Sequence, residues 1–123
     1  DGSVRLWDLP AGRAARALRL PTGADVQCVL LGRGGPTAHC AFAATGSTVC
    51  AFDLRAPGVV IQYDQAQCVG EAHDEVGQLA LSDDGAHLAA ADDAGVVHVF
   101  DLGSGRPPVV LRGHDSLCSA VAF

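Results

Sequence analysis

The sequence predicts an all-β fold of short antiparallel strands, and three observations support this prediction. First, one pattern occurs three times: a glycine-containing turn, an alternating apolar strand, then an aromatic residue followed by Asp-Leu. Its copies are DGSVRLWDL at 1–9, GSTVCAFDL at 46–54 and AGVVHVFDL at 94–102. Second, the 15 glycines and 6 prolines are spread along the chain, which is typical of many short elements joined by turns. Third, an Asp-Gly pair at 84–85 separates two apolar segments, and this dipeptide favours tight hairpins.

The spacing of the repeats predicts part of a β-propeller, in which each blade is a four-stranded sheet. The anchor aspartates Asp8, Asp53 and Asp101 lie 45 and 48 residues apart, close to the period of about 40–45 residues per blade. The chain then divides into the last two strands of an incomplete blade, two complete blades and the first strand of a further blade, at 1–20, 23–66, 71–112 and 113–123. Because propellers close with about 4–8 blades, we expect the chain to be a fragment of a longer protein.

The first outer strand is expected within residues 11–20. This stretch, AGRAARALRL, contains good helix formers, so a short helix is the alternative. It lies where the repeat requires the outer strand of a blade, and we therefore predict a strand.

The blade at 71–112 has the clearest strand pattern. Strands are expected at 76–82, 87–91, 96–102 and 108–112, joined in part by turns at 82–85 and 92–95. Because successive side chains of a strand alternate, the third strand points Val96, His98 and Phe100 to one face and Val97, Val99 and Asp101 to the other. Both faces are largely apolar, as expected for a blade packed between two others.

These segments resemble the WD-repeat family. DGSVRLWD at 1–8 follows the signature of that family almost letter for letter. The ending GHDSLCSAVAF at 113–123 matches the family's Gly-His turn, here Gly113 and His114, and its first strand. The resemblance covers the whole chain. It implies a closed ring of blades, usually seven, that serves as a docking surface for other proteins and not as an enzyme.

The family also has a buried hydrogen-bonded network of a His, a Ser or Thr, an Asp and the signature Trp. Trp7 occupies the Trp position of the first segment, but Phe52 and Phe100 replace it in the others, and phenylalanine has no N–H to donate. The resemblance places His73 and Asp93 at the His and Asp positions of the last full blade, where alanine replaces the Ser. The chain therefore departs from the family in this network and keeps its apolar packing.

Some WD-repeat proteins dock on the adaptor of cullin-4 ubiquitin ligases through the signature Trp-Asp followed, two residues on, by Arg. Phe52-Asp53-Leu54-Arg55 matches this motif except at the Trp. A guanidinium just past the end of a strand can form a two-point pair with a partner carboxylate. The resemblance implies that Arg55 contacts the adaptor while Asp53 fixes the turn. The alternative is that Arg55 is a solvated turn residue.

Charge and cysteine content argue against several partner classes. The chain has 14 acidic residues against 8 basic ones, a net charge of −6, whereas nucleic acids and anionic membranes favour a positive surface. No apolar run approaches the roughly 20 residues of a membrane helix. The five cysteines form no CxxC pair and lie mostly in apolar segments. We therefore expect free thiols and a cytoplasmic or nuclear location.

The sequence predicts no catalytic or metal-binding constellation. Hairpin turns explain the aspartates at 83–84 and 92–93, and the adjacent His39 and Cys40 face opposite sides of a strand. We therefore expect no cofactor and rank an enzyme last. A reader of basic peptides or histone tails is the alternative to a ligase receptor, because the acidic balance suits a basic partner.

Overall fold

The computed structural model describes residues 2–20, 25–55, 59–64, 74–103 and 106–123. In this part of the chain, ten β-strands and one short 3-10 helix are present, and the predicted all-β fold is confirmed. In chain order the elements are β1 (Ser3–Asp8), β2 (Arg13–Arg19), β3 (Cys28–Leu31), η1 (Gly35–Thr37), β4 (Cys40–Thr45), β5 (Thr48–Asp53), β6 (Val59–Asp64), β7 (Val76–Leu81), β8 (His87–Asp92), β9 (Val96–Asp101) and β10 (Val109–Arg112).

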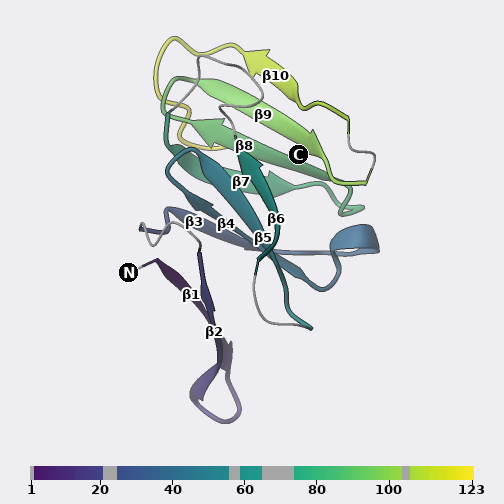
Figure 1. The fold of residues 1–123 in the computed structure, drawn as a ribbon. Coiled ribbons are helices and arrows are strands. Elements are labelled where there is room, and N and C mark those ends of the chain that lie inside the picture. The colour runs from purple at the N-terminus through teal and green to yellow at the C-terminus, as the bar shows by residue number, and fades with distance from the viewer. Residues whose placement is uncertain (1, 21–24, 56–58, 65–73, 104–105) are drawn as a thin grey trace.

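The strands form three sheets that follow one another through the molecule (Figure 1). β1 and β2 make a two-stranded N-terminal hairpin. β3 to β6 make the four-stranded middle sheet, and β7 to β10 make the four-stranded C-terminal sheet. In every sheet each strand pairs antiparallel with the next strand of the chain. The two larger sheets lie within residues 23–66 and 71–112.

A first apolar core lies between the middle and C-terminal sheets. The buried side chains of the middle sheet here are Phe42, Ala44, Val49 and Ala51, and those of the C-terminal sheet include Leu79, Leu88, Ala90 and Phe100. The alternation expected along β9 is confirmed, because its burial alternates residue by residue, with Val96, His98 and Phe100 buried. This face of β9 is the one that packs on the middle sheet.

A second core joins the N-terminal hairpin to the other face of the middle sheet. Leu18 and Leu20 pack there against Ala43, Cys50 and Phe52. The middle sheet is thus covered on both faces, which explains why four consecutive residues of β5 are buried.

β2 is a strand, as predicted, and the helix alternative is wrong. Its residues pair with β1 from Ser3 opposite Arg19 to Asp8 opposite Arg13. A strand is favoured over a helix for two reasons. It pairs with β1, and its two-residue period places Leu18 and Leu20 together on the buried face. Local helix propensity is a weak preference that tertiary contacts override.

Residues 113–123 contain no strand in the structure, although the sequence predicts one. A strand needs a neighbour with which to exchange backbone hydrogen bonds, and no described segment pairs with these residues in a ladder. The segment is still anchored to the C-terminal sheet. The N–H of Cys118 donates to the Asp92 carbonyl at 3.2 Å, and the Cys118 side chain is buried. Its assignment to a further blade stays a prediction.

Candidate functional site

Each of the three repeated strands ends in a turn that its anchor aspartate holds. Asp53 Oδ1 accepts a hydrogen bond from the backbone N–H of Arg55 at 2.9 Å, and Asp101 Oδ1 accepts one from Gly103 at 3.2 Å. Asp8 Oδ1 accepts one from the N–H three residues on, at 3.2 Å. Aspartate favours such turns because its short side chain reaches nearby backbone donors. Turn formation therefore explains the repeated aspartate.

The turn after β5 is also tied to neighbouring strands. The N–H of Leu54 donates to the His39 carbonyl, just before β4, at 2.8 Å. The carbonyl of Leu54 in turn accepts a hydrogen bond from the Arg16 guanidinium of the N-terminal hairpin. Together with the bond to Asp53, these contacts hold the turn backbone in one conformation.

The Arg55 guanidinium lies back on Asp53 in a two-point pair. Nε donates to Oδ1 at 3.1 Å and Nη2 donates to Oδ2 at 3.2 Å. The Arg55 side chain is 68% exposed and that of Asp53 is 24% exposed. The side-chain hydrogen bonds from Arg55 lower the pKa of Asp53, and the same bonds raise the pKa of Arg55. The pair therefore remains ionised at neutral pH.

This geometry is compatible with both interpretations of Arg55, as a solvated turn residue and as a contact for a partner protein. In the chain alone it is an exposed turn residue, and its partner among the described residues is Asp53. A guanidinium carries five N–H donors, and the pair with Asp53 uses two of them. Because its orientation is already fixed, Arg55 would lose less conformational entropy on binding than a freely rotating side chain. A contact with a partner protein stays a prediction.

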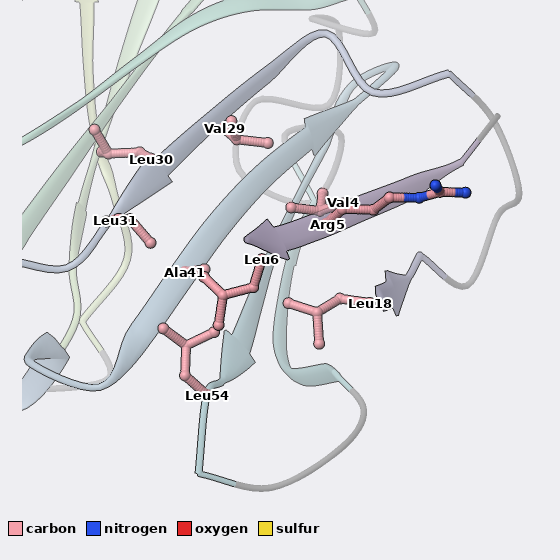
Figure 2. Close-up of a pocket in the computed structure, with 9 residues that line it drawn as sticks. All are labelled: Val4, Arg5, Leu6, Leu18, Val29, Leu30, Leu31, Ala41 and Leu54. Carbon is pink, nitrogen blue, oxygen red and sulfur yellow. The ribbon is translucent and has the colours of Figure 1, made fainter. Parts of the chain in front are cut away.

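An apolar pocket of about 230 Å³ opens beside this turn, between the N-terminal hairpin and the middle sheet (Figure 2). Its walls include Leu6 of β1, Leu31 of β3 and Leu54, the residue between Asp53 and Arg55. Neither this pocket nor the contact of Arg16 is predicted by the sequence. No local pattern signals them, because the walls come from four strands and one turn that meet only in the folded chain.

The described residues do not assemble the hydrogen-bonded network that the family resemblance implies. Trp7 is 57% exposed. Phe52 and Phe100 are buried, one in each apolar core. His73 lies outside the described residues, so its role stays a prediction.

The structure corrects the assignment of Asp93, because Asp92 is the buried aspartate of this turn. Asp92 is fully buried, and its Oδ1 accepts hydrogen bonds from the N–H groups of Ala94 and Val96 at 3.0 and 2.9 Å. Asp93 is exposed. An Asp-Asp pair does not show by itself which carboxylate points inward. Here Asp92 is the last residue of β8, on the face that packs against the middle sheet.

Gly113 and His114 are exposed, and His114 lies against the turn between β8 and β9. Gly95 in that turn has a φ of +84°, and a Cβ built on it would lie 2.7 Å from the His114 carbonyl oxygen. The Gly-His segment therefore packs closely on the turn, and a larger residue at Gly95 would displace it.

His98 is a buried titratable residue to which the sequence analysis gave no role. It is fully buried on β9, and neither ring nitrogen has a partner among the described residues. Its ring stacks on that of Phe100, with 6.5 Å between the ring centres. Burial lowers the pKa of His98, the Asp92 carboxylate acts in the opposite direction, and Arg112 lowers it further.

We expect the free energy of unfolding to decrease as the pH falls below about 6.5. In the unfolded chain His98 has its ordinary pKa of 6.5, and in the folded chain the pKa is lower. Between these two values the unfolded chain binds the proton more readily, so protonation favours unfolding. Urea unfolding at neutral and mildly acidic pH measures the loss. H98L should show a smaller loss, and an unchanged loss would rule out His98 as its source.

Among the described residues, no group of three or more His, Cys, Asp or Glu side chains is placed to hold a metal ion. The described part of the chain also has no helix that is long and apolar enough to span a membrane.

The fold is similar to that of solved WD40 structures, although no protein-family model matches the chain. One similar structure is a chain of the mitotic checkpoint complex, with a TM-score of 0.79 and 18% identity, covering 99% of this chain and 35% of that chain. Another is the structure of the RRP9 WD40 repeats, with a TM-score of 0.68 and 20% identity, covering 81% of this chain and 29% of that chain. The chain thus spans about a third of the length of these structures, and its fold is that of part of a WD40-repeat β-propeller.

Proposed function

We propose that the chain is a non-catalytic scaffold for protein–protein interaction, which docks on the adaptor of a cullin-4 ubiquitin ligase through the turn after β5. The observation that carries this proposal is the fixed and exposed guanidinium of Arg55. Asp53 holds it in a two-point pair, and the turn backbone is tied to two neighbouring segments.

Resemblance and comparison support the same class of function. GADVQCVLL at 23–31, HLAAADDAGVVHVFDL at 87–102 and the ending at 113–123 resemble WD repeat-containing protein fifty-three, which is regarded as a candidate substrate receptor of cullin-4 ligases. One of the similar solved structures belongs to a multiprotein complex. The described cysteines Cys28, Cys40, Cys50 and Cys118 are free thiols, which fits the proposed cytoplasmic or nuclear location.

The site suits a partner that offers an oxygen acceptor next to an aliphatic side chain. Arginine is common at interface hot spots because it combines charge-assisted hydrogen bonds with a long apolar stem. The acceptor would bind the guanidinium of Arg55. The aliphatic side chain would enter the pocket whose wall includes Leu54.

Replacing Arg55 with alanine is expected to weaken adaptor binding by at least tenfold, as loss of a hot-spot arginine costs about 2 kcal/mol or more. Arg33→Ala is the matched control, because Arg33 is also an exposed turn arginine paired with an aspartate, Asp83, at 3.6 Å. Arg55→Lys keeps the charge and loses the two-point geometry, so it should bind more weakly than the wild type. Titration of the purified adaptor with each variant measures the affinities.

Binding that survives Arg55→Ala would remove Arg55 from the interface. If the wild-type chain does not bind the adaptor, the ligase role is wrong.

A reader of basic peptides is the second candidate, and the net charge of −6 favours it. Its binding to a basic peptide should weaken as salt screens the charges. Arg55→Ala distinguishes the two candidates, because a basic peptide held by the acidic residues of the chain does not need the guanidinium of Arg55.

A further inference from the structure

The pair between Asp53 and Arg55 occupies only one edge of the guanidinium. Nε and Nη2 donate to the two carboxylate oxygens at 3.1 and 3.2 Å. A guanidinium is a rigid planar fork of five N–H donors, and this pair uses two of them. The hydrogens of Nη1 and the second hydrogen of Nη2 lie on another edge, directed away from Asp53. Because the Arg55 side chain is 68% exposed, this Nη1–Nη2 edge is open to a partner.

Asp53 is held in place by more than its pair with the side chain of Arg55. Its Oδ1 also accepts the backbone N–H of Arg55 at 2.9 Å, so one oxygen holds both the main chain and the side chain of the same residue. The carbonyl of that peptide group belongs to Leu54, and it accepts a hydrogen bond from the Arg16 guanidinium. Because a peptide group is planar and turns as a unit, it is held at both ends. A partner that displaced Asp53 from Arg55 would weaken this turn as well as the pair.

Charge at this site disfavours an acidic partner residue. The side-chain hydrogen bonds from Arg55 lower the pKa of Asp53, so at neutral pH the carboxylate is ionised and balances the charge of the guanidinium. A second carboxylate at the Nη1–Nη2 edge would lie close to that of Asp53, and like charges brought together at an interface cost free energy. The net charge of the chain, −6, adds to this repulsion. A neutral carbonyl oxygen accepts the same N–H groups without that cost.

We propose that the partner binds Arg55 through a neutral carbonyl oxygen at the Nη1–Nη2 edge, while Asp53 stays paired with Nε and Nη2. This inference rests on the proposed docking through Arg55 and specifies the chemistry of the partner. Asp53 is then a positioning residue, because it orients the fork before the partner arrives and so reduces the entropy lost on binding. A carbonyl oxygen has two lone pairs, so one backbone carbonyl of the partner can accept from Nη1 and Nη2 together.

The alternative arrangement is an acidic partner residue that displaces Asp53 and forms its own two-point pair with Arg55. The two arrangements predict opposite effects of removing the Asp53 carboxylate. If Asp53 orients Arg55 for a carbonyl, its loss weakens binding. If Asp53 competes with a partner carboxylate, its loss strengthens binding, because no ion pair then has to be broken.

Asp53→Asn tests the direction of the effect. It removes the charge and keeps the turn, because the asparagine side-chain oxygen can still accept the Arg55 N–H. We expect it to weaken binding of the purified adaptor by about threefold to tenfold, since a freed arginine must be ordered again on binding. Asp53→Ser also keeps an oxygen near that N–H and loses the carboxylate, so it should act in the same direction. Calorimetric titration gives the affinities, and circular dichroism shows that each variant is folded.

Two controls separate positioning from a general effect on charge or stability. Asp101→Asn removes the same charge from the same kind of turn, because Asp101 ends β9 and its Oδ1 accepts the N–H of Gly103, two residues on, at 3.2 Å. Glycine offers no guanidinium to orient, so adaptor binding should stay close to that of the wild type. When Arg55→Ala is already present, Asp53→Asn should weaken binding no further, because Asp53 acts through Arg55.

Tighter binding by Asp53→Asn would overturn the inference and make the partner's acceptor a carboxylate. Unchanged binding by both Asp53 variants would overturn it as well, because Asp53 would then not orient Arg55. An equal loss in Asp101→Asn would trace the effect to net charge and contradict the positioning role. Failure of the docking itself gives a different result, in which the wild-type chain does not bind the adaptor or Arg55→Ala binds as tightly as the wild type, and both proposals are then wrong.

Discussion

Replacing Phe52 with alanine is expected to reduce the free energy of unfolding by about 3–5 kcal/mol. The Phe52 ring is fully buried between the middle sheet and the N-terminal hairpin, where it packs with Leu18 and Leu20. Its removal takes away the burial of a large apolar side chain and leaves a cavity that the surrounding strands cannot fill. Because small domains are stable by only about 5–15 kcal/mol, the loss is a large part of the total. Urea unfolding followed by circular dichroism measures it.

Phe123→Ala is the matched control, because it removes the same ring from a position that is 63% exposed. We expect it to change the free energy of unfolding by less than about 1 kcal/mol. If both variants lost a similar amount of unfolding free energy, burial in the core would not be the cause of the destabilisation by Phe52→Ala.

The strands and their faces could be predicted because they depend on local patterns. Alternation in VVHVFD placed Val96, His98 and Phe100 on one face, and the structure buries these residues. The Asp-Gly turn was also predictable, since Gly85 adopts a φ of +72° that other residues rarely adopt. At β2 the position in the repeat was a better guide than helix propensity, because sheet pairing is a tertiary effect.

The parts that could not be predicted depend on contacts between distant segments. Nothing in the sequence shows that Asp92 turns inward and Asp93 outward, because the choice depends on where β8 ends. The contact of Arg16 with the Leu54 carbonyl joins residues 38 positions apart. The pocket beside it is a gap left by side chains of several strands. A sequence pattern records none of these arrangements.

The candidate site was predictable in part. The motif at Phe52-Asp53-Leu54-Arg55 located the turn, and Asp53 accepts a hydrogen bond there from the Arg55 N–H. The two-point pair between the side chains was not foreseen. It changes the hypothesis, because a partner must now share Arg55 with Asp53 or displace that carboxylate.

The middle and C-terminal sheets also meet through a contact between two loops. Thr37, in the loop between β3 and β4, donates from Oγ1 to the Gly85 carbonyl at 3.0 Å. Gly85 lies in the turn between β7 and β8, and a Cβ built on it would lie 2.1 Å from the Gly34 carbonyl oxygen. The two backbones approach so closely that only glycine fits.

Gly85→Ala should therefore reduce the free energy of unfolding by about 2–4 kcal/mol, among the larger effects of single substitutions. Part of this cost is the left-handed backbone conformation, about 1–2 kcal/mol for a residue with a Cβ. The rest comes from separating the two loops and breaking the bond from Thr37. Gly46→Ala isolates the first part, because Gly46 has a φ of +55° and no atom within 4 Å of its Cβ position. Thermal and urea unfolding of both variants give the difference. If the two substitutions cost the same, the close approach of the loops contributes nothing to stability.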